Sequence, residues 1–362
     1  MKVLLSGGGT AGHINPALAI AGHLSQNHQA DILFVGTKKG LENKLVPAAG
    51  WDIRYIEVSG LIRRLTLKNL SVIKQFLTAI IHAKKILKDF APDVVIGTGG
   101  YVCAPVLFAA KALKIPTIIH EQNVIPGVTV KLAAGLSDRI CISFSDTTKY
   151  LKKAFVEKCV LTGNPIREEM FSVNSGAARK ALGLDERPFV TAFGGSLGAA
   201  TINNAVLGLL NGEKTDHFQF MLGTGQRFYE QFTKGLNKKE DNIRIVPYIE
   251  NMDLVMAAAD VIIGRAGALT VSELCALGKP AILVPSPNVA HDHQTHNAKS
   301  MEKIGGAIVI ADRELSPETL KKAIDSVLDN EAGMAAMAEN ARRAGITDGA
   351  KRISDVALSL LK

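Results

Sequence analysis

Short hydrophobic runs alternate with longer amphipathic segments in the N-terminal part of the chain. The runs read "KVLLS", "DILFVG", "PDVVIG" and "PTIIHE", and the segments after the first three read "PALAIAGHLSQ", "GLENKLVPAAG" and "APVLFAAKALK". A short apolar run bounded by turn formers is typical of a buried strand, whereas the longer segments have the length of helices. The alternation predicts βαβ units and a mostly parallel sheet.

The same alternation starts again after "LTGNPIREEMF". Strands are predicted in "RPFVTAFGG", "FQFMLGTG", "IRIVPYI", "ADVIIGRAG", "PAILVPS" and "AIVIA", and helices in "ATINNAVLGLL" and "ALTVSELCALG". Residues 313–362 show only helical patterns. We predict an α/β protein with two doubly wound, Rossmann-like domains, residues 1–162 and 163–344, divided near the turn formers Gly163–Pro165. Ligands of such sheets bind outside the carboxyl ends of the strands, so the two domains are expected to face a cleft.

Composition narrows the class of protein. Of 362 residues, 47% are hydrophobic and 21% are charged, which is typical of a soluble globular protein. No apolar run approaches the ~18 residues that span a bilayer, and the first residues lack the features of a signal peptide. We therefore expect a cytoplasmic protein that is not inserted in a membrane. The formal charge of +8 favours an anionic partner: nucleic acid, an acidic membrane surface or a phosphorylated substrate.

A basic amphipathic helix is predicted between Leu65 and Phe90. Its apolar residues recur near helical spacing, and lysines separate them: Leu70, Ile73, Leu77, Ile80 and Leu87 on the one hand, Lys68, Lys74, Lys84, Lys85 and Lys88 on the other. Two interpretations stay open, a surface helix with a solvated basic face and a stretch that meets a membrane. The adjoining "GLIRRLTLK" favours the second.

The glycine-rich turn "GGGTAGH" follows the first predicted strand. Gly7, Gly9 and Gly12 satisfy G-x-G-x-x-G, which occurs in nicotinamide-binding folds. Such folds place an acid at the end of the second strand, but Asp31, the only acid near that strand, precedes it. Glycines before a helix N-terminus still predict a site for an anion. His13, directly behind the turn, has the place of a general base, and the alternative is that it caps the helix or packs on Pro16.

Two further turns in the second half predict a nucleotide site. "GGSLGA" repeats the phosphate-binding pattern, and "GRAGALTVSE" runs from a strand into a helix with Glu273 one turn further on. A carboxylate at that place suits the hydroxyls of a ribose. The cluster "HDHQTHNA" raises the alternative of a metal site at His291, His293 and His296, but no acid or thiol set completes the coordination, and we expect no metal. The four cysteines are too far apart for a disulfide or zinc pattern.

Seven motifs together resemble one family. They are "GGGTAGHINPALAIA", "GTGGYVCAP", "HEQNVIPG", "LTGNPIR", "FGGSLGA", "RAGALTVSE" and "HQTHNA". Their kind and order resemble the peptidoglycan glycosyltransferases that add N-acetylglucosamine to undecaprenyl-diphospho-N-acetylmuramoyl-pentapeptide. The resemblance implies a two-domain fold of the GT-B type, a last helix at about 345–362 that returns to the first domain, UDP-N-acetylglucosamine in the second domain and the lipid acceptor in the first.

The resemblance also implies the site residues. His13 would be the catalytic base, with Glu121 as a second candidate, and Gly9, Thr10 and Tyr101 would bind the acceptor. The residues implied for the donor are Thr10, Ala11, Gly12, His13, Asn123, Arg167, Ser196, Ile249, Leu269, Thr270, Glu273 and Gln294. Arg63, Arg64 and Lys68 would meet an anionic membrane. The family usually has glycine where this chain has Ala11.

The implied reaction needs no cofactor. The 4-hydroxyl of the muramoyl sugar loses its proton to a base and attacks the anomeric carbon, so that the configuration inverts and UDP leaves. Such an enzyme would work as a peripheral protein at the cytoplasmic face of the cell membrane. The alternatives are a GT-B enzyme with another acceptor, a nicotinamide-dependent oxidoreductase and a basic nucleic-acid-binding module. The last is disfavoured because only 5% of residues are aromatic, so no nucleic acid partner is expected.

Overall fold

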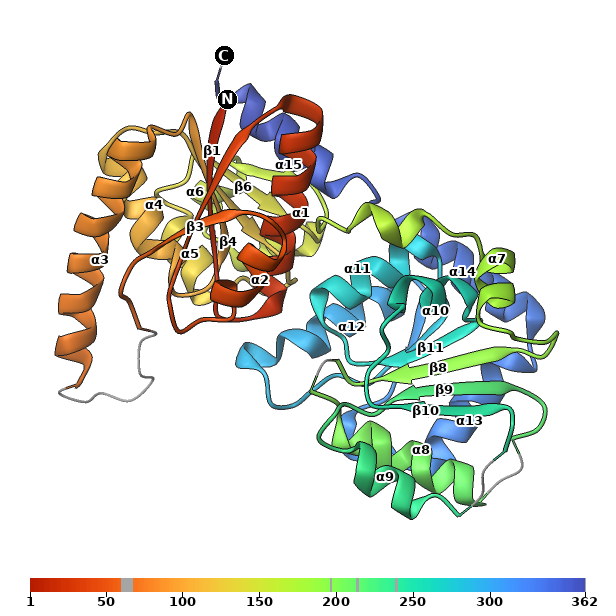
Figure 1. Ribbon diagram of the computed structural model, residues 1–362. Helices are drawn as coiled ribbons and strands as arrows, with labels where there is room; N and C mark the ends of the chain where they lie inside the picture. Colours follow the sequence, from red (N-terminus) through yellow and green to blue (C-terminus); the bar gives the residue numbers. More distant parts are fainter. Residues whose placement is uncertain (60–67, 196, 213–214, 238–239, 362) are drawn as a thin grey trace. The chain divides into compact units, whose positions relative to one another are not determined.

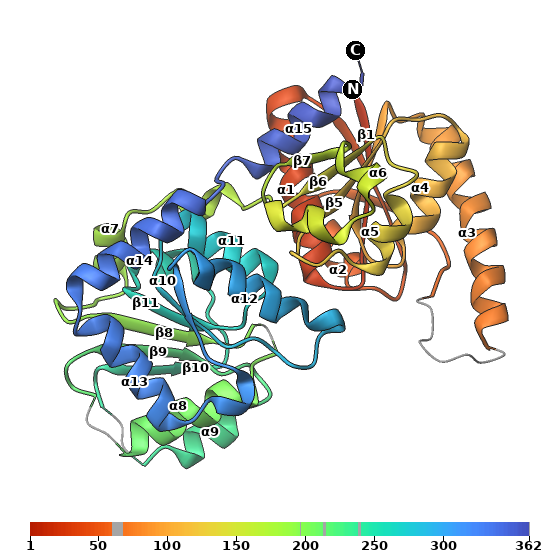
Figure 2. The same ribbon diagram turned by 180° about the vertical axis from the view of Figure 1, so that it is seen from behind.

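The computed structural model describes residues 1–59, 68–195, 197–212, 215–237 and 240–361, without the side chains of 68–71. The chain forms two compact units, which are described separately. The first comprises Met1–Ile166 and Thr347–Lys362, and the second comprises Arg167–Ile346. Figure 1 shows the elements of both units, and Figure 2 shows them from behind.

The first unit is built on a parallel sheet of seven strands in the order β3-β2-β1-β4-β5-β6-β7. The strands are β1 (Lys2–Gly7), β2 (Asp31–Gly36), β3 (Asp52–Tyr55), β4 (Val94–Gly99), β5 (Thr117–Glu121), β6 (Arg139–Ile142) and β7 (Cys159–Leu161). The helices are α1 (Ala11–His28), α2 (Glu42–Ala48), α3 (Lys68–Phe90), α4 (Cys103–Ala112), α5 (Val128–Ala133), α6 (Lys153–Val156), α15 (Gly349–Ser359) and the 3₁₀ helix η1 (Ser145–Tyr150).

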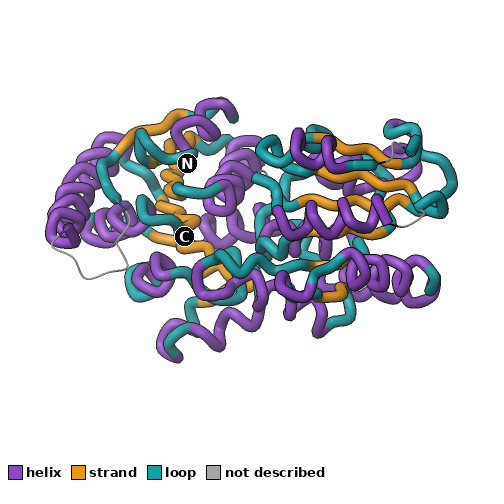
Figure 3. The backbone as a smooth tube through the Cα atoms, turned by 90° about the horizontal axis from the view of Figure 1, so that it is seen from below, coloured by secondary structure: helices purple, strands orange, loops and turns teal. Residues whose placement is uncertain are grey.

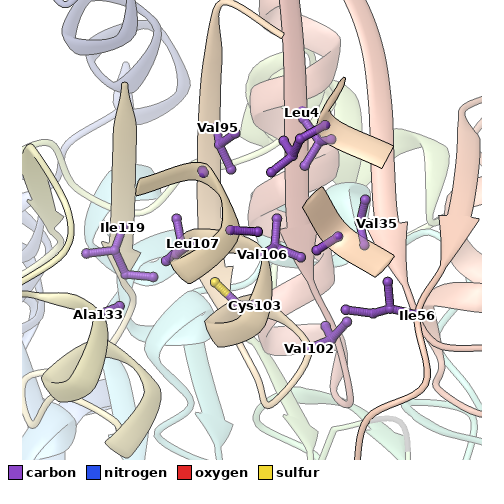
Figure 4. Packing of buried hydrophobic residues seen from close by; sticks show 14 of the residues in the cluster. Leu4, Val35, Ile56, Val95, Val102, Cys103, Val106, Leu107, Ile119 and Ala133 are labelled. Carbon is purple, nitrogen blue, oxygen red and sulfur yellow. The ribbon is translucent and has the colours of Figure 1, made fainter. Parts of the chain in front are cut away.

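Helices cover both faces of this sheet. Along β1, Val3 and Leu5 pack with α1, α2 and α15, while Leu4 points to the other face and packs with α3, α4 and α5. Because side chains alternate along a strand, a strand buried on both faces is a continuous apolar run, which is why "KVLL" lacks polar alternation. Figure 4 shows Cys103, Val106 and Leu107 of α4 among the side chains of the strands.

The C-terminal helix completes the first unit. Ile353 and Ala357 of α15 are fully buried in the same cluster as Ile14 and Ala17 of α1. Figures 1 and 2 both show α15 alongside α1, with the two chain ends close together. Where α15 begins, a Cβ on Gly349 would lie 2.5 Å from the carbonyl oxygen of Asn164, so the two chain segments pack backbone to backbone.

The second unit repeats this architecture with a parallel sheet of six strands in the order β10-β9-β8-β11-β12-β13. The strands are β8 (Phe189–Phe193), β9 (Gln219–Gly223), β10 (Ile243–Val246), β11 (Val261–Gly264), β12 (Ala281–Leu283) and β13 (Ala307–Val309). The helices are α7 (Ser175–Ala181), α8 (Ala200–Gly212), α9 (Tyr229–Gly235), α10 (Met252–Ala258), α11 (Ala268–Leu277), α12 (His293–Lys303), α13 (Pro317–Leu328) and α14 (Glu331–Ala344), with the 3₁₀ helices η2 (Glu168–Phe171), η3 (Ala290–Asp292) and η4 (Asp312–Glu314).

In each sheet the strand order reverses beside the first strand of the unit, β1 or β8. Figure 3 shows the strands of both units with helices around them. In doubly wound sheets the reversal point is where ligands bind, at the carboxyl ends of the strands. Ligands are therefore expected at the turns after β1 and β4, and at those after β8 and β11. None of the helices described here is long and apolar enough to cross a membrane.

Candidate functional site

Glycines bring the turns after β1 and β4 into backbone contact. The N–H of Gly8 donates to the carbonyl of Gly99 at 3.3 Å, and a Cβ on Gly100 would lie 2.2 Å from the carbonyl oxygen of Gly8. Gly9, Gly99 and Gly100 all have a positive φ, which glycine adopts without strain. The two turns thus form one compact surface at the carboxyl ends of β1 and β4.

The imidazole of His13 is anchored on this surface. Its Nδ1 lies 3.1 Å from the carbonyl oxygen of Gly8 and 3.2 Å from Oγ1 of Thr10, the N-cap residue of α1. A carbonyl oxygen can only accept, so the ring proton of the neutral form belongs on Nδ1 and Nε2 is the basic nitrogen. The carbonyl of His13 accepts a hydrogen bond from the buried Thr98 at 2.7 Å. The Nδ1 contact is made to a carbonyl, so it does not cap the helix.

A buried carboxylate lies beneath the same turn. Glu42, 1% exposed, accepts hydrogen bonds from the N–H of Gly9 at 3.0 Å, the N–H of Thr37 at 2.9 Å and the hydroxyl of Thr37 at 2.7 Å. Burial raises the pKa of Glu42, but these hydrogen bonds outweigh it and the pKa is lowered. The expectation that only Asp31 stands near the second strand is therefore wrong. No local pattern marks Glu42, because its partners come from two separate turns.

Tyr101 and Asn123 lie on the turns after β4 and β5. A Cβ on Gly9 would be 3.3 Å from the Tyr101 ring, and the Tyr101 hydroxyl is 3.4 Å from Oγ1 of Thr37. The backbone and side-chain N–H groups of Asn123 donate to one oxygen of Glu121 at 2.8 and 3.1 Å, and the N–H of Gly127 donates to the other at 2.8 Å. Both oxygens of Glu121 thus accept from its own loop, which suits an orienting role better than that of a base.

The second unit has a pocket of about 160 Å³ at the carboxyl ends of β8 to β10 and the start of α11. Three residues expected at the donor site, Ile249, Thr270 and Glu273, lie in its wall. The other lining residues are Phe193, Gly195, Gly223, Gly225, Pro247, Tyr248, Met252 and Met256. Three further expected residues of this unit do not line the pocket: Leu269 is in the first turn of α11, Arg167 precedes η2, and Gln294 lies on α12, where its side-chain oxygen accepts from the N–H of Ser286 at 2.8 Å. The expected donor residues Thr10, Ala11, Gly12, His13 and Asn123 belong to the first unit, with Ala11, Gly12 and His13 in the first turn of α1. Ser196 is outside the described residues.

Glu273 has a strongly perturbed carboxyl group. Burial raises its pKa to about 7, and the positive charge of Arg167 opposes that rise. Perturbed carboxyl groups in pockets are candidates for ligand contacts, because a ligand hydroxyl can replace the water lost on folding. This arrangement suits the ribose contact expected of Glu273.

Backbone packing also shapes the turns of the second unit. The N–H of Gly198 donates to the carbonyl of Gly195 at 2.9 Å, and a Cβ on Gly198 would lie 2.1 Å from the carbonyl oxygen of Thr224. A Cβ on Gly225 would lie 2.6 Å from the nitrogen of Gly198. The turn before α8 is therefore pressed against the turn after β9, which places the N-terminus of α8 next to the pocket wall.

An ion pair holds the other turns of the second unit together. The guanidinium of Arg265, just after β11, pairs with Asp312 and also donates to the carbonyl of Val284 at 3.1 Å. Thr201, in the first turn of α8, donates to the other oxygen of Asp312 at 3.1 Å. One carboxylate thus connects the starts of α8 and α11, the two helices that follow the glycine turns. No motif in the sequence marks Asp312, which lies between the predicted strand "AIVIA" and the helical pattern of residues 313–362.

The histidine cluster adopts a strained turn. His291 and Asp292 both have a positive φ, 54° and 51°, and Nδ1 of His293 lies 2.8 Å from the carbonyl oxygen of Ala290. Non-glycine residues in this conformation cost about 1–3 kcal/mol each and are concentrated at functional sites. Across the part of the chain that the structure describes, no group of three or more His, Cys, Asp or Glu residues is arranged to hold a metal ion.

Helix α3 exposes an apolar stripe on the first unit. Ile73, Leu77 and Ile81 are 52%, 57% and 66% exposed, whereas Val72, Ala79, Ala83 and Leu87 face the core. Of the apolar residues that recur near helical spacing, Ile73 and Leu77 are therefore exposed, whereas Leu87 is buried. Lys85 continues the exposed stripe one turn beyond Ile81, and Lys74 and Lys88 are exposed beside it. Arg63 and Arg64 lie outside the described residues, as does the side chain of Lys68.

Comparisons with known proteins identify the class first. Residues 3–142 match the glycosyltransferase family 28 N-terminal domain, and residues 189–353 match the glycosyltransferase family 28 C-terminal domain. The crystal structure of Acinetobacter baumannii MurG is similar over 99% of both chains, with 29% identity and a TM-score of 0.81. The prediction of two Rossmann-like domains of the GT-B glycosyltransferase type is confirmed.

Curated relatives identify the family more closely. A protein of Acetivibrio thermocellus is 46% identical over 100% of this chain and 99% of its own length, and one of Ruminiclostridium cellulolyticum is 45% identical over 98% of both chains. The chain belongs to the family that both are named for, the UDP-N-acetylglucosamine--N-acetylmuramyl-(pentapeptide) pyrophosphoryl-undecaprenol N-acetylglucosamine transferases. The predicted resemblance is confirmed, and the oxidoreductase and nucleic-acid-binding alternatives are set aside.

Proposed function

We propose that this chain transfers N-acetylglucosamine from UDP-N-acetylglucosamine to the muramoyl sugar of undecaprenyl-diphospho-muramoyl-pentapeptide, which forms the lipid-linked disaccharide precursor of peptidoglycan. The observation that carries the proposal is the 46% identity along the entire chain with a relative named for this reaction. The pocket with Glu273 and the anchored imidazole of His13 supply groups that such a reaction requires.

The donor binds to the second unit. Glu273 accepts hydrogen bonds from the ribose hydroxyls, and Ile249, 5% exposed in the pocket wall, lies by the uracil. The first-turn N–H groups of α11, around Leu269 and Thr270, face the diphosphate, because a helix N-terminus has unpaired donors and a positive dipole end. As the sugar leaves the diphosphate, these donors stabilise the charge that develops on UDP.

The acceptor binds to the first unit, where His13 is the base. Nε2 takes the proton of the muramoyl 4-hydroxyl while its oxygen forms a bond to the anomeric carbon of the donor. The bond from that carbon to the phosphate oxygen breaks, and UDP departs with the electron pair. Attack from the face opposite the leaving group inverts the α-linked donor to a β-linked product. The proton on Nδ1 stays on the ring, and the imidazolium then releases the extra proton to solvent.

The exposed stripe of α3 meets the membrane that carries the acceptor. Ile73, Leu77 and Ile81 can enter the interface between head groups and acyl chains, and Lys74 and Lys85 can pair with anionic head groups. Arg63, Arg64 and Lys68 are further basic residues shortly before this stripe in the sequence, and we propose that they also pair with anionic head groups. Because nucleotide sugars are cytoplasmic, we place the protein at the cytoplasmic face of the membrane as a peripheral protein.

The test is transfer of labelled N-acetylglucosamine from UDP-N-acetylglucosamine to a short-chain lipid-linked muramoyl-pentapeptide acceptor. We expect a labelled disaccharide product with a β linkage. Acceptors without the muramoyl sugar, such as diacylglycerol, separate this reaction from that of another GT-B enzyme. Folded protein that binds UDP but labels only such an acceptor would contradict the proposal.

A further inference from the structure

One peptide group connects Glu42 to His13. The carbonyl of Gly8 and the N–H of Gly9 belong to the same peptide bond. The carbonyl oxygen lies 3.1 Å from Nδ1 of His13, and the N–H donates to Oε2 of Glu42 at 3.0 Å. The order of groups is therefore carboxylate, peptide, imidazole, with a hydrogen bond at each junction.

We propose that Glu42 is a positioning residue of the transfer reaction, which acts on the base His13 through the Gly8–Gly9 peptide group and holds its imidazole in the Nδ1–H form. This inference rests on the proposed role of His13. It adds a residue that neither the glycine motif nor the pocket includes. Glu42 does not touch the substrates; its effect is carried by the peptide.

Peptide resonance explains how the charge is transmitted. The C–N bond has partial double-bond character, so a carboxylate that accepts the N–H increases the negative charge on the carbonyl oxygen of the same group. That oxygen is then a better acceptor for Nδ1–H, and it stabilises the imidazolium that forms when Nε2 takes a proton. In a catalytic triad, a carboxylate that accepts a hydrogen bond directly from Nδ1–H fixes the tautomer and stabilises the imidazolium. Here Glu42 has the same effect on His13 through the peptide group.

The surroundings of Glu42 are built for a fixed carboxylate. Both of its oxygens are used, since Oε1 accepts from the N–H and the hydroxyl of Thr37. Glycines allow the close approach: a Cβ on Gly8 would lie 2.8 Å from the carboxylate, and one on Gly40 would lie 2.2 Å from it. The hydrogen bonds lower the pKa of Glu42 in spite of its burial, so the group stays ionised at neutral pH.

The effect of Glu42 on the pKa of His13 can be measured, because the neighbouring His120 is neutral. His120, at the end of β5, is fully buried, and burial lowers its pKa to about 4, so it is neutral at the pH of the reaction. Its Nδ1 lies 3.0 Å from the side-chain nitrogen of Gln122. The ring of Tyr101 lies beside Gly9. At neutral pH Glu42 is ionised and His120 is neutral, so Glu42→Gln removes a negative charge near His13 and leaves the charge of His120 unchanged.

The experiment follows the titration of His13 by NMR in histidine-labelled full-length protein, with His13→Ala used to assign the signal. In Glu42→Gln we expect the pKa of His13 to fall by about half a unit or more, because the charge that stabilises the imidazolium through the Gly8–Gly9 peptide is removed. The acid limb of kcat/KM should move by the same amount, and kcat should fall several-fold. A merely structural role would lower kcat and leave the limb in place. Glu57→Gln, which neutralises an exposed carboxylate of the same unit, should change neither quantity.

Wild-type protein provides a second measurement that does not depend on the folding of the variant. The amide signal of Gly9 should titrate with the pKa of His13, because both groups share one peptide. The proposal would be overturned if the pKa of His13 were unchanged in folded Glu42→Gln. It would also be overturned if the amide signal of Gly9 did not change with pH around the pKa of His13. If His13→Ala kept normal turnover, the assignment of the base would fail, while the NMR titration would still show whether Glu42 acts on the ring.

Discussion

The imidazole of His13 lies directly against the backbone of Gly99. A Cβ on Gly99 would be 2.8 Å from Cδ2 and 3.1 Å from Nε2 of the ring, closer than side chains normally approach. Gly99 also has a φ of +105°, so the turn after β4 both requires glycine and leaves room for the proposed base.

Gly99→Ala should displace the His13 ring. We expect kcat to fall by about 100-fold, because a misplacement of ~1 Å at a reacting group has that effect. Backbone strain alone should lower the free energy of unfolding by ~1–3 kcal/mol. Gly50→Ala is the matched control, since Gly50 has a φ of +83° and no atom within 4 Å of its Cβ position. Equal losses of turnover in the two variants would refute a role of ring position.

His13→Ala should remove the base and leave the donor site intact. We expect kcat to fall by ~10²–10⁴-fold, the usual contribution of general-base catalysis, with the dissociation constant of UDP changed less than about twofold. Turnover is measured by label transfer and UDP binding by calorimetry. His217→Ala, at a half-exposed histidine of the second unit, serves as control. Turnover close to that of the wild type would assign the proton transfer to another group.

Glu273→Gln should separate stability from binding. The carboxyl of Glu273 has a raised pKa of about 7 in the folded protein, so the folded state is penalised above the unfolded value of 4.5. The penalty grows as the pH rises from 4.5 to 7 and reaches ~3 kcal/mol above that. The glutamine variant should therefore be more stable than the wild type at pH 8 and equal to it at pH 4.5, as measured by urea unfolding.

The same substitution should weaken donor binding. Loss of the charged acceptor for the ribose hydroxyls should raise the dissociation constant of UDP at least about tenfold at pH 8. In the wild type, affinity should decline as the pH falls below about 7, when Glu273 takes up a proton. Glu186→Gln, at an exposed carboxylate, should affect neither stability nor binding. A variant that is destabilised at pH 8 would contradict the burial argument.

Asp312→Asn should loosen the turns before α8 and α11. It leaves the largely buried guanidinium of Arg265 without its charged partner and weakens the contact to Thr201. We expect a loss of ~1–3 kcal/mol in the free energy of unfolding, below the value for fully buried pairs because water reaches both groups. UDP affinity should fall several-fold. Glu302→Gln, which breaks the exposed pair with Lys299, should cost less than about 0.5 kcal/mol. Similar costs for the two variants would mean that the Asp312 pair has no special role.

Replacement of Ile73, Leu77 and Ile81 by serine should weaken binding to anionic vesicles. Each side chain is more than half exposed, so folding stability should change little, whereas the apolar area available to the bilayer is lost. Sedimentation with vesicles containing anionic lipid should show at least tenfold weaker binding, and turnover of a soluble short-chain acceptor should persist. Ile304→Ser, at an exposed apolar residue of the second unit, is the control. Unchanged sedimentation of the triple variant would show that this stripe does not bind the membrane.

The sequence predicted the central strands and missed three peripheral ones. Strands such as β1 and β8 are buried on both faces, so they are continuous apolar runs that any reading detects. In contrast β3 ("DIRY") and β7 ("CVL") lie at the sheet edges and β6 ("RICI") beside β7, each with only three or four residues. The edge strands β3 and β7 are only partly buried and therefore have a weak apolar pattern, whereas β6 is buried apart from Arg139 and was missed because it is short.

For the site, the sequence by itself determined which turns hold chemistry. Gly9, His13 and Glu273 stand in local motifs whose glycines and helix starts have a direct physical meaning. Tertiary structure decided which distant groups meet them. Glu42 contacts Gly9 from the next βα unit, and Asp312 connects Thr201 to Arg265. The side of α3 that is exposed depends on the packing of α4 against its other side. Such contacts join residues far apart in the chain, and nothing in a local pattern encodes them, because packing and burial arise only when the whole sheet and its helices assemble.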